Sequence, residues 1–283
     1  MLMTSGRTYV SRELAHFDPD KTFNCGQCFR FEKVSDGVWE GVAYGKYIKV
    51  TKNTDDIVLF SGVDAEEFNA VWYDYFDCST DYNLIADSLE KSGYDIMNEA
   101  VKVSRGIRIL KQDPWETLCS FIISQNNNIP RIKKIINNIC REYGDKIISP
   151  DGREFYGFPS ARTLFEAGEE AIFALKTGFR AKYIYDAAKK VALGDIDINA
   201  AYDMDILTAN EYLKQIKGVG DKVAACVLLF AYHKTESFPV DIWVKKILKK
   251  YFGGNVPQFG MYAGMAQQYL FYYERYIIGG IKQ

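Results

Sequence analysis

A lysine and an aspartate stand where they could act together on a sugar. Lys222 directly follows a glycine-rich turn, and Asp241 comes 19 residues later, at the predicted start of a helix. A lysine amine can form a covalent Schiff base, and a carboxylate can stabilise an oxocarbenium-like transition state. The pair therefore favours cleavage of a glycosidic bond through an imine. Taken alone, each residue also fits a simpler role: Lys222 as a phosphate-binding cation and Asp241 as a plain helix cap.

Two helices and a tight turn must position this pair. The pattern predicts a helix-hairpin-helix over residues 213–226, with Gly218, Val219 and Gly220 in its turn. Glycines let the backbone approach a ligand closely, and the free N–H groups of a helix N-terminus bind phosphate. Such a contact positions DNA without reading its sequence. An ordinary tight turn between two helices is the alternative interpretation.

The rest of the chain divides into two patterns. Residues 1–100 contain strand-like runs at 38–51 and 55–60, broken by glycines, and then a capped helix over 64–76. Residues 101–283 are helical in pattern, with helices predicted over 113–125, 131–142, 160–176, 180–193, 205–216, 221–232, 242–251 and 258–277. We therefore expect an α+β fold, with an N-terminal antiparallel sheet domain with helices (1–100) and a helical domain (101–283).

Charge is distributed unevenly between these two regions. Residues 1–100 carry 9 Lys and Arg against 18 Asp and Glu, whereas the remaining residues carry a net charge of +7. A basic region that contains the hairpin indicates an anionic partner. A chance division of solvated surface charge is the alternative.

The composition excludes several classes of protein. No run of 18 apolar residues occurs, so no membrane span is expected. Residues 1–10 lack the apolar core of a signal peptide, so we expect an intracellular protein, in the cytoplasm or nucleoid of a prokaryote or the nucleus of a eukaryote. Cys25 and Cys28 form the one C-x-x-C pair, without a second pair or a nearby histidine. We expect free thiols, no metal site and no organic cofactor.

Four further segments give the sequence a specific resemblance. They are Asn24–Phe31, Gln112–Ile129, Gly178–Tyr183 and Tyr262–Phe271. Together with the hairpin lysine and Asp241, they resemble the 8-oxoguanine DNA glycosylases of the helix-hairpin-helix superfamily. The matches keep their order along most of the chain. The resemblance implies a twisted antiparallel sheet domain followed by the helical glycosylase core.

The resemblance also implies a pocket for an extruded base. In it, the carbonyl of Gly26 accepts the N7–H that 8-oxoguanine has and guanine lacks. Cys226 and Phe271 enclose the base, and Gln267 meets its Watson–Crick edge. Without the resemblance, Cys226 and Phe271 would be interpreted as core residues.

Three positions match residues that enter the DNA, and a fourth matches a phosphate contact. Asn126 and Arg131 would fill the gap left by the extruded base and contact the opposite cytosine. Phe179 matches a wedge position that is tyrosine in the better-known members. Trp243 stands where those members carry a histidine near a phosphate.

The expected function is therefore a bifunctional DNA repair glycosylase. It would excise 8-oxoguanine from double-stranded DNA as a monomer and nick the strand by β-elimination through a Lys222 Schiff base. Three alternatives remain: a glycosylase for another damaged purine, a non-catalytic helix-hairpin-helix DNA-binding protein and a C-x-x-C thiol oxidoreductase.

Overall fold

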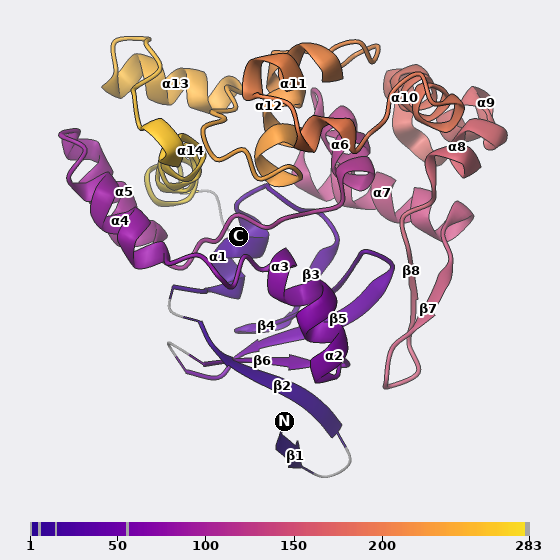
Figure 1. Cartoon of the computed structure of the whole chain (residues 1–283), viewed down its shortest axis with the longest axis horizontal. Coiled ribbons are helices and arrows are strands. Elements are labelled where there is room, and N and C mark those ends of the chain that lie inside the picture. The colour runs from indigo at the N-terminus through magenta and orange to yellow at the C-terminus, as the bar shows by residue number, and fades with distance from the viewer. Residues whose placement is uncertain (1, 5–6, 15, 55–56, 281–283) are drawn as a thin grey trace.

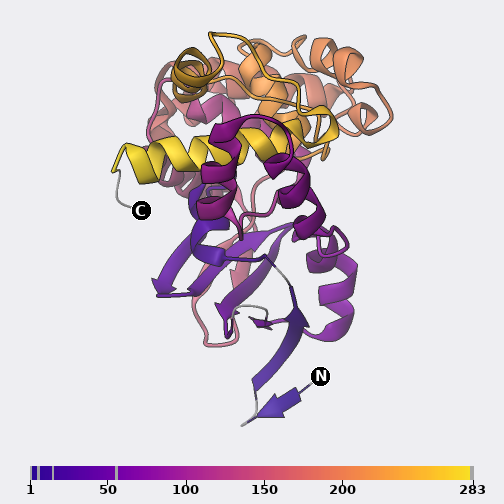
Figure 2. The same ribbon diagram turned by 90° about the vertical axis from the view of Figure 1, so that its left-hand side faces the viewer.

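The computed structural model describes residues 2–4, 7–14, 16–54 and 57–280. Its strands lie at one end of the molecule and most of its helices at the other (Figures 1 and 2). Six antiparallel strands form one sheet in the order β1-β2-β6-β5-β4-β3. The strands are β1 (Leu2–Thr4), β2 (Arg7–Glu13), β3 (Phe31–Ser35), β4 (Val38–Ala43), β5 (Lys46–Lys52) and β6 (Ile57–Ser61). The predicted α+β class is confirmed.

A segment of helix covers the sheet through aromatic side chains. It runs through α2 (Ala65–Glu67), a π-helical turn (Phe68–Trp72) and α3 (Tyr73–Tyr75). Asp64 caps it by accepting a hydrogen bond from the backbone N–H of Glu67, as the sequence predicts. Phe60 contacts Phe68 with 4.7 Å between ring centroids, and the core of this part of the molecule is built largely from such pairs.

The remaining helices form a second, larger core. They are α4 (Tyr82–Glu90), α5 (Asp95–Ser104), α6 (Pro114–Ser124), α7 (Ile129–Tyr143), α8 (Ala161–Ala167), α9 (Glu169–Ile172), α10 (Ala181–Leu193), α11 (Ile206–Leu213), α12 (Asp221–Phe230), α13 (Ile242–Tyr251) and α14 (Ala263–Tyr272). Side chains of α4 and α5 share this core with those of α12 and α14. The short helix α1 (Pro19–Asn24) instead places Phe23 in the core of the sheet region. The division of the chain at residue 100 stays a prediction. No helix in the described part is both long and apolar enough to cross a bilayer.

Two local predictions need correction. The single helix expected over 160–176 is broken, because Gly168 adopts a φ of 87° between α8 and α9 and Lys176 a φ of 70° near its end. A hairpin of β7 (Lys146–Ile148) and β8 (Glu154–Tyr156) was not predicted. It descends from the helical part beside the six-stranded sheet (Figure 1), where Arg153 pairs with Glu40.

Candidate active site

The helix-hairpin-helix is formed by α11, a turn at 214–220 and α12. Gly218 has a φ of +84°, and a β-carbon there would lie 2.4 Å from the ring of Tyr183 on α10, so only glycine fits. Val219 is buried beneath the turn. Gly220 caps α12 without a side chain, and nothing would meet a β-carbon there within 4 Å. The first N–H groups of α12 are therefore open to a phosphate oxygen.

Lys222 lies in the first turn of α12 and reaches the end of α6. Its Nζ donates to the hydroxyl of Ser124 at 3.0 Å and lies 5.0 Å from the ring centroid of Phe121. The Ser124 hydroxyl donates in turn to the carbonyl of Phe121 at 2.8 Å. The hydroxyl is thus fixed as an acceptor, and it holds the amine at one place between two helices.

Asp241 is the N-cap of α13, as predicted. Its Oδ1 accepts hydrogen bonds from the backbone N–H groups of Trp243 at 2.9 Å and Val244 at 2.8 Å. Lys222 and Asp241, the predicted catalytic pair, both affect the pKa of one thiol, that of Cys226. Burial raises the pKa of Cys226 to about 11; the nearby Lys222 amine lowers this pKa and the Asp241 carboxylate raises it. Lys222, Asp241 and Cys226 therefore belong to one site.

Gly26 approaches Phe271 from the other end of the chain. Gly26 follows α1 with a φ of +83°, and a β-carbon there would lie 3.7 Å from Cε1 of the Phe271 ring. The loop is fixed from behind by Gln27, whose buried amide donates to the carbonyl of Arg108 at 2.7 Å and accepts from the N–H of Leu110 at 2.9 Å. Gly26 and Phe271, two predicted base contacts, therefore face each other.

Gln267 lies four residues before Phe271 on α14 and is 4% exposed. Its Oε1 accepts a hydrogen bond from Nε2 of Gln268 at 2.8 Å. The Oε1 of Gln268 is buried and meets no donor among the described residues. The amide of Gln267 is thereby oriented by its neighbour, a partner that the sequence did not reveal.

Asn126, Arg131 and Phe179 meet around a buried arginine. Asn126 is exposed with a φ of 47°, and Phe179 is 48% exposed. Arg131 approaches from α7: its Nη2 would lie 4.0 Å from a β-carbon on Gly178. Arg180, which is 1% exposed, stacks 4.4 Å from the Phe179 ring and donates to the carbonyls of Gln125 and Asn126, so it ties these elements together.

Trp243 lies in the first turn of α13 beside two cations. Its ring centroid is 4.7 Å from Nζ of Lys246 and 5.8 Å from Cζ of Arg275. Trp243 also packs against the small apolar cluster of Phe271, Val244 and Leu248. The predicted phosphate-contact position is therefore continuous with the predicted base pocket.

Cys25 and Cys28 are buried structural thiols. Burial raises the pKa of Cys25 to about 12, against the opposing effect of Gln27, and also raises the pKa of Cys28. Thiolate chemistry needs an accessible, acidified cysteine, so these values disfavour the thiol oxidoreductase interpretation. Among the described residues no group of three or more His, Cys, Asp or Glu side chains could hold a metal ion.

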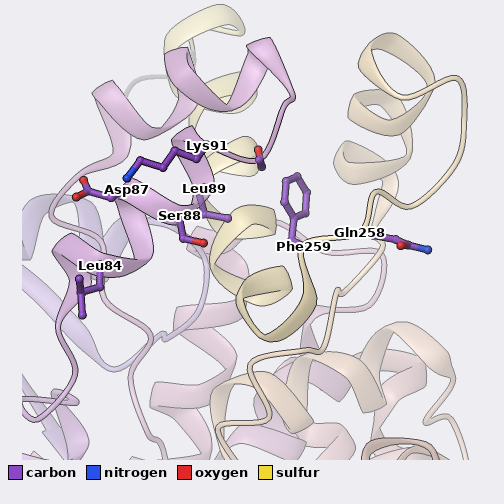
Figure 3. Close-up of a pocket in the computed structure, with 8 residues that line it drawn as sticks. Leu84, Asp87, Ser88, Leu89, Lys91, Gln258 and Phe259 are labelled. Atoms are coloured by element: carbon purple, nitrogen blue, oxygen red, sulfur yellow. The ribbon is translucent and has the colours of Figure 1, made fainter.

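A surface hollow lies apart from all predicted site residues. It has a volume of about 560 Å³ and is lined by α4, the following turn and the 258–259 segment. Figure 3 shows Leu84 and Asp87 on one side of it and Phe259 on the other. None of the residues predicted to bind DNA or the base lines this hollow, so it is not part of the candidate active site.

The predicted residues thus fall into three groups. Lys222, Asp241 and Cys226 form the first, Gly26, Gln267, Phe271 and Trp243 the second, and Asn126, Arg131 and Phe179 the third, with the hairpin turn beside the first. Ser124, Arg180, Gln268 and Arg275 were not predicted. The roles of all these residues stay predictions.

Comparison with known families defines the class of protein. Residues 119–258 match the model of the HhH-GPD superfamily of base excision DNA repair proteins. Residues 10–118 match the model of the 8-oxoguanine DNA glycosylase N-terminal domain. The chain belongs to the 8-oxoguanine DNA glycosylase family. This membership confirms the expected class of enzyme, a base excision DNA glycosylase.

Solved structures of similar proteins cover nearly the whole chain. MBOgg1 in complex with a low-affinity DNA ligand is 40% identical with a TM-score of 0.91, over 95% of this chain and 96% of that one. The Clostridium acetobutylicum 8-oxoguanine glycosylase/lyase, in complex with double-stranded DNA containing cytosine opposite 8-oxoguanine, is 36% identical with a TM-score of 0.89, over 97% of this chain and 98% of that one.

A curated relative matches over a shorter span. The N-glycosylase/DNA lyase of Saccharomyces cerevisiae is 40% identical over 157 residues, which are 52% of this chain and 42% of the yeast protein. The match therefore spans less than half of the yeast protein's length.

Proposed function

We propose that this chain excises 8-oxoguanine from double-stranded DNA and then nicks the strand. The observation that carries the proposal is the position of Lys222 in the first turn of α12, beside the open N-terminus of that helix and with its amine bound to Ser124. Asp241 at the start of α13 lies near enough to Cys226, one turn after Lys222, to affect the pKa of its thiol. A phosphate held at that terminus would bring the sugar of the same strand toward the amine. The relatives named N-glycosylase/DNA lyase and 8-oxoguanine glycosylase/lyase support the same assignment.

The damaged nucleotide must first leave the duplex. Extrusion costs a few kcal/mol of unstacking and pairing energy, which phosphate contacts and wedge insertion offset. Asn126, Arg131 and Phe179 are exposed together and would enter the vacated space. The base would enter beside Phe271, where the Gly26 carbonyl would accept the N7–H of 8-oxoguanine. Guanine presents a lone pair at N7, so the same acceptor would repel it.

The chemistry then proceeds at the sugar. The amine of Lys222 attacks C1′ as the bond between C1′ and N9 breaks; the bonding electrons leave with the base, which takes up a proton. The Asp241 carboxylate stabilises the positive charge that develops on the sugar. The nitrogen lone pair of the adduct then forms the C=N bond of an imine as the bond between C1′ and O4′ breaks, and the proton on nitrogen passes to O4′. Loss of a proton from C2′ then breaks the bond between C3′ and oxygen and releases the 3′ phosphate.

Borohydride trapping tests this function. It uses duplexes that contain 8-oxoguanine opposite each of the four bases, with undamaged guanine as control. We expect a covalent adduct on damaged duplexes, and its loss in Lys222→Gln with damage-specific binding retained. A persistent adduct in Lys222→Gln would overturn the Schiff-base assignment. Excision of alkylated purines instead would favour the other-purine glycosylase, and binding without turnover would favour the non-catalytic module.

A further inference from the structure

Arg275 extends the line of predicted base contacts by one turn. Gln267, Phe271 and Arg275 follow one another at intervals of four residues through α14 and the π-helical segment Tyr273–Ile278. The guanidinium carbon lies 5.4 Å from the ring centroid of Phe271, 5.8 Å from Trp243 and 5.5 Å from Tyr276. Three aromatic rings therefore hold a planar cation beside the predicted base pocket.

The guanidinium has no acidic partner within the described part of the chain. Its Nε is buried and meets no acceptor among the described residues. The neighbouring carboxylate of Glu274 points elsewhere, where it pairs with Lys250 at 3.0 Å and accepts from the hydroxyl of Tyr251 at 2.9 Å. A buried donor without an acceptor is costly, so the unpaired Nε of Arg275 requires an explanation, and an acceptor supplied by a ligand is one that fits its place beside the predicted base pocket.

A second cation contacts Trp243, one of the three rings that Arg275 approaches. Nζ of Lys246 lies 4.7 Å from the ring centroid of Trp243, the same ring that Arg275 approaches. Two cations that share one ring repel each other and create a positive potential there. An anionic oxygen placed between or beside them would relieve this repulsion.

We propose that Arg275 binds an oxygen atom of the extruded nucleotide. This inference rests on the proposed function and adds a binding residue to it. The guanidinium presents five N–H donors and no acceptor, so its ligand must be an acceptor. The nearby Lys246 favours a phosphate oxygen, and a carbonyl oxygen of the base offers the same chemistry.

Binding measurements on two duplexes test the proposal and separate the two sources. Fluorescence anisotropy is measured in the Lys222→Gln background, which prevents turnover. One duplex contains 8-oxoguanine, and the other contains a tetrahydrofuran abasic analogue, which keeps the phosphates but lacks a base. Arg275→Met should weaken binding of the 8-oxoguanine duplex about tenfold or more, the loss expected for a charge-assisted hydrogen bond.

The second duplex and the salt dependence identify the oxygen. If Arg275 binds a phosphate, the abasic duplex loses the same factor, and the slope of log K against log salt falls by about one. If it binds a base carbonyl, only the 8-oxoguanine duplex loses affinity and the slope stays unchanged. Affinities for both duplexes within about twofold of the parent would overturn the proposal.

Two variants guard against indirect effects. Arg275→Lys keeps the charge but loses the planar fork, so it should retain the thermal midpoint of the parent and show a smaller loss of affinity. If Arg275→Met fails to fold, the affinity of Arg275→Lys for the two duplexes replaces it as the test of the proposal. Arg141→Met is the matched control, because Arg141 also stacks on an aromatic ring, 5.6 Å from that of Tyr156 on β8.

The design also separates this inference from the proposed function. If Lys222→Gln binds damaged and undamaged duplexes equally, the proposed function fails. If the preference for damage is present and Arg275→Met leaves both affinities intact, the role of Arg275 alone fails.

Discussion

The amine of Lys222 is bound, 3.0 Å away, by the hydroxyl of Ser124, a residue from another helix. Ser124 ends α6, directly before the loop that carries Asn126. The proposed nucleophile and the proposed gap-filling residue are therefore fixed to the same few residues of backbone. We therefore expect entry of Asn126 into DNA to affect the alignment of the amine.

Replacing Ser124 by Ala should slow imine formation about tenfold, because the amine loses its hydrogen bond to the Ser124 hydroxyl and with it a defined position. Borohydride trapping under single-turnover conditions measures the rate. Binding of damaged DNA should stay near the wild-type value. Ser120→Ala, one turn earlier on the same helix, is the matched control. An unchanged or faster trapping rate in Ser124→Ala would contradict the positioning role.

The two glycines of the hairpin should fail in different ways. Gly218→Ala places a β-carbon 2.4 Å from the Tyr183 ring at a φ of +84°, so it should destabilise the fold by about 2–4 kcal/mol. The β-carbon of Gly220→Ala has no neighbour within 4 Å, so this variant should unfold near the wild-type midpoint. It should still weaken DNA binding, because the added methyl group crowds the phosphate. Thermal unfolding and anisotropy separate the two. Equal unfolding midpoints for both variants would show the close packing at Gly218 to be unimportant.

Gln268 should act through Gln267. Gln268→Leu removes the donor to Gln267 Oε1 and also removes a buried oxygen that lacks a donor, so stability should hold or rise. The preference for 8-oxoguanine over guanine should fall about three- to tenfold, because the Gln267 amide loses its orientation. Single-turnover excision on both duplexes measures this ratio. A loss of stability with an unchanged ratio would assign Gln268 a structural role only.

Arg180 should control how the duplex is opened. Arg180→Lys keeps the charge but loses the guanidinium fork, which donates to the Gln125 carbonyl through both Nε and Nη2 and to the Asn126 carbonyl through Nη2, and it loses the guanidinium contact with the Phe179 ring. We expect slower extrusion of the damaged base. The fluorescence of 2-aminopurine placed beside the lesion measures this rate. Arg162→Lys on α8, where the arginine side chain is 58% exposed, is the control. Identical fluorescence rise times in the two variants would exclude this role.

Glu116 should make stability depend on pH. Burial raises the pKa of Glu116 to about 7 and Asp113 adds to this, whereas Arg30, 3.5 Å away, opposes it. The folded protein then retains a proton that the unfolded chain releases near pH 4.5, so wild-type stability falls as the pH rises from about 4.5 to about 7.

Glu116→Gln should not show this fall. The free energy of unfolding of the variant, compared with that of wild type, should therefore rise by on the order of 2–3 kcal/mol between pH 4 and pH 8. Urea unfolding of both proteins across this range measures the difference. Parallel stability curves would show that Glu116 titrates normally.

Signals confined to a few neighbouring residues predicted the structure well. The caps at Asp64, Asp113 and Asp241 all accept the backbone hydrogen bonds that their positions suggested. Such caps depend on side chains two or three residues away, so the sequence contains the whole interaction. The same holds for the bounds of α13, which were predicted without error.

Features that depend on distant packing were missed. Nothing beside Arg180 in sequence shows that its guanidinium is buried against the end of α6. The β7–β8 hairpin is short, and it is stabilised by contacts such as the Tyr47–Phe155 ring pair, 4.8 Å between centroids, with a strand of the main sheet. The contact of Lys222 with Ser124 joins residues 98 positions apart. Periodicity and capping rules contain no information on such pairs.

The contact between Gly26 and Phe271 has a consequence for the order in which the parts of the site form during folding. Close by, the hydroxyl of Tyr276 donates to the carbonyl of Asn24, a contact across 252 positions. Closing so long a loop costs more chain entropy than the short loop between Lys222 and Asp241. The contact between Gly26 and Phe271 is therefore expected to form late in folding and to be lost early in partial unfolding, whereas the short chain between Lys222 and Asp241 keeps the amine near its carboxylate. A partly unfolded molecule of this kind would keep its reactive amine while losing its selectivity, which makes the cooperativity of unfolding a safeguard for intact DNA.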